Sequence, residues 1–255
     1  MAKLFESQTV MVSGGLGDIG RATAFQFARE GANVAIGDVH PPSQAADCME
    51  QLNDCHVACT YTQVDVTDPS AVDRWIDETQ KHIAVPQIII ANAAVVTVAG
   101  IHEITDEQWA REINVNLNGA FYMSRSAASK LVAAGLPGKI VFVGSWVGAV
   151  PSTSIPAYSV SKAALNMLCK CMALELAPHN ILVNEIAPGY VAAGLSARIW
   201  ENNPAERAVA LNKVPVKKIM SADTVAGQIV NICDPHNEHI TGSTILIDGG
   251  LSLLS

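Results

Sequence analysis

Tyr158 and Lys162 lie four residues apart in a segment with a helical pattern, so both side chains are expected on one helix face. A phenol has a pKa near ~10 and is a poor base at neutral pH. An ammonium group ~4 Å away, at an effective dielectric of about 20, favours the phenolate by roughly 4 kcal/mol, or about three pK units. The pair is therefore suited to proton exchange with a substrate, with Tyr158 as the acid or base.

Ser145 lies thirteen positions before Tyr158 and directly after an apolar run of strand length. The carboxyl edge of a parallel sheet is where such folds present ligands. A hydroxyl there is suited to bind a substrate oxygen and hold the reacting carbon in place. Taken one by one, these residues have ordinary alternatives: a turn serine, a packed tyrosine and a solvated lysine. The spacing of the three residues favours a shared catalytic role over these alternatives.

A glycine-rich turn, Ser13–Gly20, follows the first predicted strand and opens a helix. Its glycines match the pattern G-x-G-x-x-G. Missing side chains permit a tight turn and let a pyrophosphate approach the N–H groups at the helix start. The turn predicts a dinucleotide site, and a merely glycine-rich turn is the alternative. The expected contacts are Gly14, Gly15, Gly17, Asp18, Ile19 and Gly20.

Asp38 ends the second predicted strand. Its carboxylate can accept hydrogen bonds from both adenosine ribose hydroxyls and would repel a 2′-phosphate. Arg21 and His40 are the nearby residues that could offset this repulsion. The sequence therefore favours NAD as the cofactor.

Three further residues are expected on the adenosine side. Asp65 and Val66 close the third strand, and Asp65 is expected near the adenine; the alternative is a helix cap before Asp68 and Pro69. Asn92 closes the fourth strand, where small residues let the adenosine half lie flat. An ordinary asparagine turn is the alternative for that position.

Apolar runs of strand length alternate with helical patterns along the chain, and most runs are near-continuous, as in parallel strands buried on both faces. The predicted strands are Gln8–Ser13, Asn33–Gly37, Val57–Val64, Gln87–Ala91, Lys139–Gly144, Ile181–Ile186 and Thr244–Ile247. The predicted helices are Ile19–Glu30, Pro69–His82, Asp106–Ala134, Tyr158–Ala177 and Ser221–Ile232. This order predicts an α/β fold: a single doubly wound Rossmann-type domain over residues 1–255, with a seven-stranded parallel sheet flanked by helices. The least regular segment, Val191–Met220, is a candidate lid.

Composition limits the class of protein. Of the 255 residues 49% are hydrophobic and 16% charged, which predicts a sizeable core. The net charge of −8 argues against nucleic-acid binding. No signal peptide and no apolar run of membrane-spanning length is recognised, so we expect a cytoplasmic protein without a membrane partner. The six cysteines are scattered and form no C-x-x-C pair, so reduced thiols and no metal site are expected.

In combination these motifs resemble the short-chain dehydrogenase/reductase family over essentially the whole chain. The family's motifs match Gly14–Gly20, Asn116, Ser145, Tyr158 with Lys162, Pro188-Gly189, and the closing segment Thr241–Gly250. The resemblance implies that Tyr158 is the general acid/base, and that Lys162 lowers its pKa and binds the nicotinamide ribose. It also implies that Asn116 holds a water in a proton relay, with a helix-kink asparagine as the alternative. Pro188, Gly189 and Val191 are expected at the cofactor.

The chain departs from the family pattern at three positions. Asp18 stands where the family usually has glycine, and its carboxylate would repel a pyrophosphate unless it turns outward or caps the helix. Ala94 replaces the glycine of an Asn-Ala-Gly motif. Ala193 replaces a threonine that usually contacts the nicotinamide amide. None of these changes removes a catalytic group.

Substrate signals are weak. Ser145, Trp146, Tyr158 and Tyr190 are expected in the substrate pocket, with Arg198 and Trp200 from the candidate lid. The alternative for the aromatic residues is simple packing, and for the lid arginine a solvated charge.

The favoured function is an NAD-dependent oxidoreductase acting on a small alcohol or ketone, in particular a polyol, sugar or hydroxy acid. Two alternatives stay open: a 3-oxoacyl-thioester reductase, which Asp38 disfavours, and a non-catalytic NAD-sensing regulator on the same fold. By resemblance a homotetramer is expected, with Asp106–Ala134 and Tyr158–Ala177 in a four-helix contact. Ala127, Ala128 and Leu168 are expected in that contact.

Overall fold

The computed structural model describes residues 3–254, apart from the side chains at positions 195, 198, 199 and 202. Within this range the chain forms one sheet of seven parallel strands in the order β3-β2-β1-β4-β5-β6-β7. The strands are β1 (Thr9–Ser13), β2 (Asn33–Asp38), β3 (Cys59–Gln63), β4 (Ile88–Ala91), β5 (Gly138–Val143), β6 (Ile181–Pro188) and β7 (Thr244–Ile247). The expected seven-stranded doubly wound sheet is confirmed. Its strand order reverses between β1 and β4, which is where such folds place a ligand crevice.

Strand ends differ from the expected ones because pairing, rather than local composition, decides where a strand stops. β2 continues to Asp38 through its pairing with Gln63, and β6 continues to Pro188 through its pairing with Ile247. β3 begins two residues later than expected, at Cys59, which pairs with Val34.

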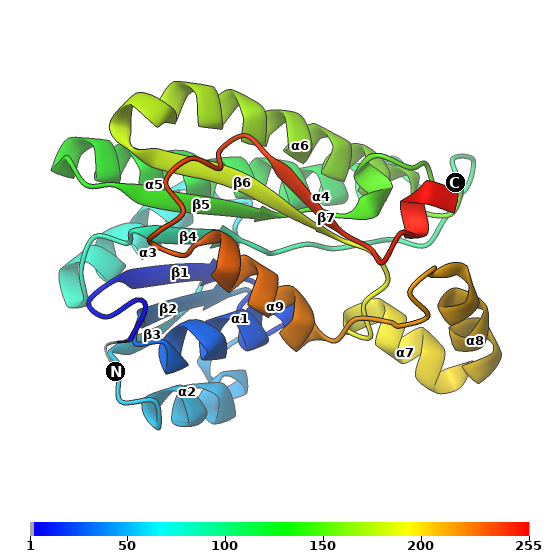
Figure 1. Cartoon of the computed structure of the whole chain (residues 1–255), viewed down its shortest axis with the longest axis horizontal. Coiled ribbons are helices and arrows are strands. Elements are labelled where there is room, and N and C mark those ends of the chain that lie inside the picture. Colours follow the sequence, from blue (N-terminus) through cyan, green and yellow to red (C-terminus); the bar gives the residue numbers. More distant parts are fainter. Residues whose placement is uncertain (1–2, 255) are drawn as a thin grey trace.

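Helices cover both faces of the sheet (Figure 1). One face carries α1 (Asp18–Arg29), α2 (Ala46–Asn53) and α9 (Ala222–Ile232); the other carries α3 (Pro69–His82), α4 (Asp106–Ile113), α5 (Ala120–Ala134) and α6 (Pro156–Leu176). A separate hydrophobic core lies between the sheet and each helix layer. The core under the α1 layer buries Phe27, Leu52 and Ile229, and the core under the α5 layer buries Trp75 and Met123. Burial of each such side chain stabilises the fold by roughly 1.5–3 kcal/mol.

The long helix expected over Asp106–Ala134 is interrupted. A π-helical stretch, Asn114–Gly119, separates α4 from α5. Gly119 packs directly against the β3–α3 connection, because a Cβ there would lie 2.6 Å from Cγ2 of Val66. Such π stretches occur frequently at functional sites.

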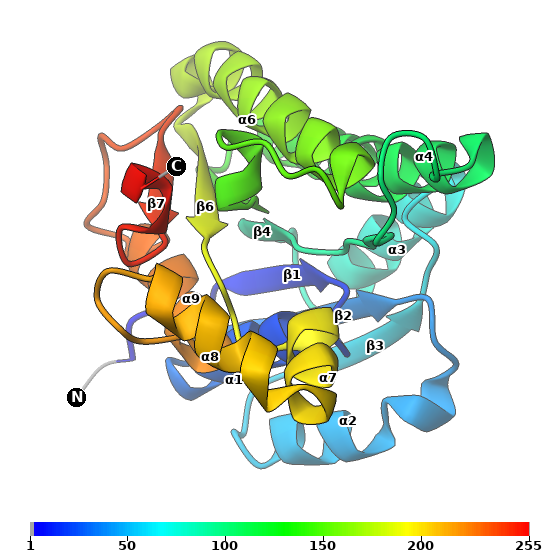
Figure 2. The ribbon, with the colours of Figure 1, turned by 90° about the vertical axis from the view of Figure 1, so that its right-hand side faces the viewer.

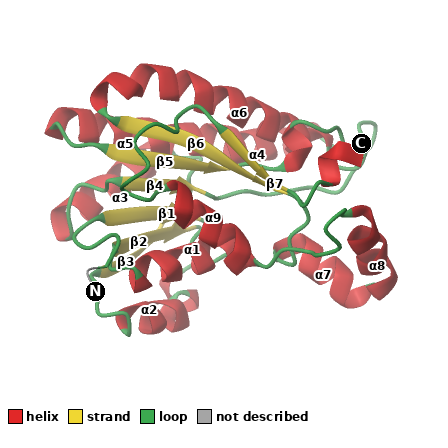
Figure 3. Ribbon diagram, viewed as in Figure 1, coloured by secondary structure: helices red, strands yellow, loops and turns green. Residues whose placement is uncertain are grey.

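Two helices fill the candidate lid, which had no expected regular structure: α7 (Gly194–Asn202) and α8 (Pro204–Lys213). The sequence contained a signal for α8, since an asparagine followed by a proline is typical of a helix start. In the structure Asn203 accepts a hydrogen bond from the N–H of Glu206, and Pro204 occupies the first turn. Figure 3 shows both helices beyond one end of the sheet, and Figure 2, which looks onto that end, shows them in front of it.

Short 3₁₀ segments complete the fold at Pro42–Gln44, Trp146–Gly148, Ala177–His179 and Leu251–Leu254. In the part of the chain that is described, no helix is both long enough and apolar enough to cross a membrane.

Candidate active site

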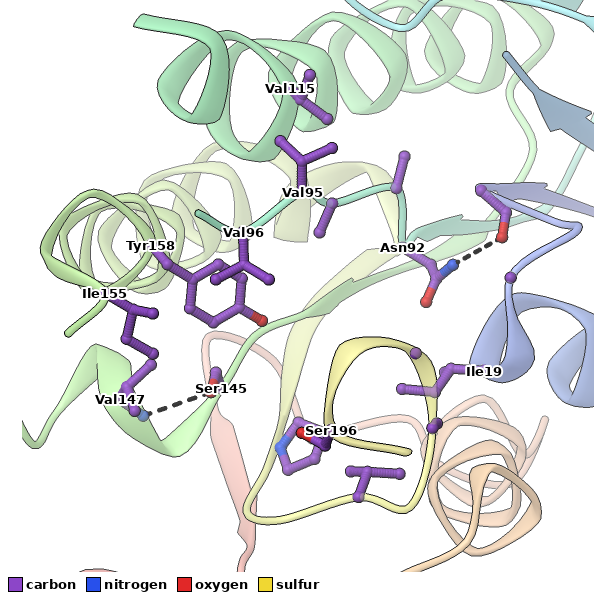
Figure 4. A pocket seen from close by; sticks show the side chains of 18 of the residues that line it. Ile19, Asn92, Val95, Val96, Val115, Ser145, Val147, Ile155, Tyr158 and Ser196 are labelled. Carbon is purple, nitrogen blue, oxygen red and sulfur yellow. Dashed lines mark hydrogen bonds between the residues drawn. The ribbon is translucent and has the colours of Figure 1, made fainter. Parts of the chain in front are cut away.

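A cavity of about 1430 Å³ lies at the carboxyl edge of the sheet. The glycine turn, the ends of β2 to β6, the start of α6 and the segment that opens α7 all contribute to its wall. Figure 4 shows Tyr158 and Ser145 on one side of the cavity, with Asn92 and Ile19 on the other. The topological switch point thus brings the expected acid/base together with the expected dinucleotide turn.

Tyr158 lies in the first turn of α6 and lines the cavity together with Ser145. Ser145 follows β5 and directly precedes the short 3₁₀ segment Trp146–Gly148. Its Oγ accepts a hydrogen bond of 3.4 Å from the N–H of Val147 in that segment. Removal from water raises the pKa of Tyr158 to about 12, a hydrogen bond with Ser145 acts in the opposite direction, and the charge of Glu112 raises it further. The structure therefore brings Tyr158 and Ser145 together as expected.

Lys162 lies one helical turn further along α6 and is 2% exposed. Its Nζ donates a hydrogen bond of 2.7 Å to the carbonyl oxygen of Val143 and lies 5.4 Å from the centre of the Tyr158 ring. Burial lowers the pKa of this lysine to about 8, and the nearby carboxylate of Glu185 acts in the opposite direction.

The expected three-unit fall in the pKa of Tyr158 is not found. That fall was expected for a charged ammonium in a solvent-screened environment. Both groups are instead removed from water, and burial disfavours the charged form of each. Lys162 nevertheless lies beside Tyr158, with its Nζ 5.4 Å from the centre of the ring.

Asn116 lies in the π-helical stretch and is buried. Its Oδ1 accepts from the N–H of Val95 at 2.8 Å, and its Nδ2 donates to the carbonyl of Val95 at 2.9 Å and to Oγ of Ser161 at 3.1 Å. Ser161 in turn donates to the carbonyl of Tyr158 at 2.7 Å. Asn116 thus ties the segment after β4 to the helix that carries Tyr158, while its expected role in a water relay stays a prediction.

The glycine turn has the shape of a phosphate cradle. Gly14 has φ +63°, and a Cβ there would lie 2.9 Å from Cα of Ala93. A Cβ on Gly15 would lie 2.7 Å from Cβ of Ile36, and one on Gly20 would collide with the carbonyl oxygen of Gly14. Gly14 and Gly17 line the cavity, whereas Gly15 and Gly20 permit the close packing behind it. These residues fit the pyrophosphate of a dinucleotide.

Asp38 lies in the cavity wall beyond this turn. Its Oδ2 accepts from the N–H of Leu16 at 3.0 Å, and its Oδ1 lies 2.6 Å from Nδ1 of His40. The guanidinium of Arg21, the other residue expected to offset the acid, lies 5.7 Å from the centre of the Phe25 ring. The carboxylate is therefore held in place at the position expected for a ribose-binding acid.

Asp18 lines the cavity beside the glycine turn, and its side chain reaches the lid. Its Oδ2 accepts a hydrogen bond of 2.7 Å from the N–H of Gly194, the first residue of α7. The carboxylate therefore caps a helix, but α7 rather than its own. Ile19 also lines the cavity.

The remaining expected cofactor residues have mixed roles. Asp65 and Val66 line the cavity, but the carboxylate of Asp65 accepts hydrogen bonds from the N–H and the hydroxyl of Thr67. Asp68, not Asp65, caps α3. Asn92 donates from Nδ2 to the carbonyl oxygens of Ser13 at 2.9 Å and of the next residue at 3.1 Å, so it clamps the glycine turn. Pro188, Gly189, Tyr190 and Val191 follow in the wall.

The expected substrate residues are only partly brought together. Trp146 and Tyr190 line the cavity, with ring centres 5.6 Å apart in an edge-to-face arrangement. Trp200 is largely buried behind Tyr190, with ring centres 6.1 Å apart, so it supports the wall rather than lining it. The side chain of Arg198 lies outside the described residues. Among the described side chains, Arg111 and Lys213 bring positive charge to the cavity wall, and Arg111 had not been expected from the sequence.

Two buried acids near the catalytic residues were also missed. Glu112 is 1% exposed, and its Oε1 accepts from the N–H of Thr97 at 2.6 Å. Glu185 is 2% exposed within β6. A charged residue inside an otherwise apolar strand was the available signal for Glu185. Over residues 3–254, no three His, Cys, Asp or Glu side chains gather in a way that could hold a metal ion.

Comparison with known proteins identifies the family. A family model described as enoyl-(acyl carrier protein) reductase matches residues 15–252. A 2,3-dihydro-2,3-dihydroxybenzoate dehydrogenase of Bacillus subtilis is 31% identical, with 99% of this chain and 98% of that protein covered. A sorbitol dehydrogenase of Cereibacter sphaeroides is 32% identical over 96% of this chain and 97% of its own. A short-chain type dehydrogenase/reductase of Mycobacterium marinum superposes with a TM-score of 0.91 at 27% identity, covering 98% of this chain and 97% of its own.

The chain belongs to the short-chain dehydrogenase/reductase family. It is an oxidoreductase that uses a nicotinamide cofactor and acts on a small molecule.

Proposed function

We propose that the protein is an NAD-dependent dehydrogenase that interconverts a secondary alcohol and its ketone. A polyol, a sugar or a hydroxy acid is the favoured alcohol. The observation that carries the proposal is the joint placement of Tyr158 and Ser145 in one cavity wall, with Asp38 in the same cavity. The names of the relatives, which include a sorbitol dehydrogenase and a 2,3-dihydro-2,3-dihydroxybenzoate dehydrogenase, support an alcohol as the substrate.

The catalytic groups bind the substrate oxygen and transfer the proton of the substrate hydroxyl. When bound, a nicotinamide dinucleotide supplies the hydride acceptor or donor. The Oγ of Ser145 binds the substrate oxygen and orients the reacting carbon. The hydroxyl of Tyr158 accepts the alcohol proton during oxidation and returns it during reduction. Lys162, as an ammonium, stabilises the phenolate form of Tyr158.

Asp38 sets the preference for NAD. Its Oδ2 is fixed by the N–H of Leu16, and Oδ1 is paired with His40. A 2′-phosphate at this position would meet a held carboxylate at close range, and a bare ribose would meet a hydrogen-bond acceptor.

The segment over residues 191–220 acts as a lid of the single catalytic domain. Val191, at its start, forms an isolated β-bridge with Met220 at its end. The two ends of the segment are therefore joined to each other. Helices α7 and α8 lie between these anchors and are suited to close over the nicotinamide side of the cavity.

In the proposed homotetramer, the outer face of α6 forms one contact between protomers, and the C-terminal segment helps to build the second. Ala127 and Ala128 do not contribute, because both are buried within the core of their own chain. Val160, Met167 and Leu174 are exposed instead, at 47%, 58% and 82%. They recur every seven residues and so share one side of the helix.

An assay over a panel of secondary alcohols tests the function. Polyols, aldoses and hydroxy acids are supplied with NAD, and formation of NADH is followed by absorbance. A second set supplies 3-oxoacyl thioesters with NADPH, because the matching family model is described as a reductase of acyl-carrier substrates. We expect turnover in the first set. Turnover in the second set alone would favour the thioester reductase, and NADH binding without any turnover would favour the regulator.

A further inference from the structure

Glu185 is a buried acid for which the catalytic steps above have no use. It lies in β6, between β5 and β7, and is 2% exposed. Placing a carboxylate in such a position is costly unless it is hydrogen-bonded and paired with a cation. The carboxylate fits because residue 144, directly after β5, is a glycine. A Cβ on Gly144 would collide with the carboxylate of Glu185.

The carboxylate is oriented by two neutral groups. Its Oε2 accepts from Nδ2 of Asn166 at 2.8 Å and from the hydroxyl of Thr244 at 2.6 Å. Asn166 lies four residues after Lys162 in α6, so both side chains leave the helix on the same face, toward the sheet. These two contacts fix the direction of the acid but supply no positive charge.

Lys162 is the buried cation on that face. Its Nζ is bonded to the carbonyl of Val143, and the carboxylate of Glu185 lies against Gly144, the next residue of the chain. Strand register agrees with this placement, because Glu185 pairs with Phe142 in β5. The lysine and the acid therefore lie on the same side of the sheet, and each is 2% exposed.

We propose that Glu185 is a positioning residue that keeps Lys162 in its ammonium form, with Asn166 and Thr244 holding the carboxylate in place. The inference rests on the proposed function for its catalytic meaning, because Lys162 stabilises the phenolate of Tyr158 by its charge and a neutral lysine would not. The buried acid thus sets the pH range over which the catalytic pair works, although it touches neither substrate nor cofactor.

The electrostatics have a definite sign. Burial lowers the pKa of Lys162 to about 8, and Glu185 opposes this fall. Tyr158 faces the lysine from the same helix, and Glu112 faces the tyrosine from α4, where its charge raises the pKa of the phenol. Loss of the Glu185 charge should therefore lower the pKa of Lys162 further, so that the ammonium is lost at a lower pH.

The test is a direct titration of Lys162 in the free protein, by NMR of lysine labelled at its ε-carbon. The signal is assigned by its absence from Lys162→Arg. Glu185→Gln keeps the shape of the acid and removes its charge, and it should move the titration of Lys162 down by about one pH unit, the low end of the effect of a nearby charge. Thr244→Val is the matched control, since it removes one hydrogen bond but leaves the charge, and it should leave the midpoint in place.

Three results would overturn the inference: an unmoved midpoint in a folded Glu185→Gln protein, an equal shift in Thr244→Val, or a Lys162 that is already neutral at neutral pH in the unmodified protein. The last measurement needs no variant of Glu185, so it applies even if Glu185→Gln does not fold. None of these readouts requires turnover, so failure of the proposed alcohol oxidation would be seen separately in the substrate panel.

Discussion

The carboxylate of Asp18 and the N–H of Gly194 are joined by a hydrogen bond of 2.7 Å across 176 positions of sequence. One partner belongs to the glycine turn and the other begins the first lid helix, α7. The acid that replaces a family glycine therefore connects the expected phosphate site to the lid. This contact places a negative charge in the cavity wall where a pyrophosphate is expected.

Asp18→Asn should strengthen NADH binding by about tenfold, or ~1.4 kcal/mol, because the charge is lost while an amide oxygen can still accept from Gly194. Asp18→Gly should give a similar gain in affinity but faster hydrogen exchange at the start of α7, since the hydrogen bond is lost as well. Titration calorimetry and exchange mass spectrometry on the two variants separate charge from contact. Unchanged affinity in both variants would show that the carboxylate does not face the cofactor.

Asp38→Ala should narrow the difference in affinity between NADH and NADPH. The expected change is a loss of NADH affinity and a gain for NADPH, because the variant removes both the ribose acceptor and the repulsion of a 2′-phosphate. His40→Ala is the matched control, since it removes the ring paired with Oδ1 but keeps the carboxylate. Equal affinity for the two cofactors in the unmodified protein would contradict the assignment.

Met167→Glu should weaken the assembly, because it places a charge in the middle of the exposed apolar side of α6. Val209→Glu, at a residue of α8 that is 55% exposed, serves as the control and should leave the assembly intact. Light scattering at micromolar concentration measures the mass of each protein. A monomer in the unmodified protein would rule out the proposed tetramer.

Oxidation should accelerate as pH rises, and reduction should slow over the same range. Oxidation needs the phenolate of Tyr158 as base, and burial raises the pKa of this group to about 12 in the free protein, so the base form grows toward alkaline pH. The lysine, whose pKa burial lowers to about 8, loses its charge on the way, which limits the rise. The pH profiles of kcat/KM in the two directions, which report groups of the free protein, check this. A value of kcat/KM for oxidation that falls steadily from neutral to alkaline pH would contradict the role of Tyr158.

The sequence predicted the sheet well because hydrophobic runs of strand length directly reflect burial on both faces. β7 begins and ends at the expected residues, as does α3, which has a proline at its start and basic residues in its last turn. The cavity residues Gly14, Asp38, Ser145 and Tyr158 followed from motif spacing. The π-helical stretch around Asn116 could not be predicted, because the local sequence has a continuous helical pattern and the close approach of Gly119 to Val66 joins segments far apart in the chain.

The electrostatics of the site were harder to predict than its composition. The pKa of Tyr158 depends on how deeply its hydroxyl is buried and on Glu112, and neither burial depth nor a contact between distant segments can be read from local sequence. The same holds for Glu185, whose role becomes visible only when β6 is placed beside Gly144 and α6.

Turnover by Tyr158→Phe, measured beside NADH affinity, tests the central claim most directly. The ring is kept and only the hydroxyl is removed, so the variant should bind NADH as the unmodified protein does. Its rate of alcohol oxidation, on the best substrate of the panel, should fall far below one tenth. A variant that keeps more than about a tenth of the activity, which corresponds to a loss of under ~1.4 kcal/mol of transition-state stabilisation, would show that Tyr158 is not the acid/base.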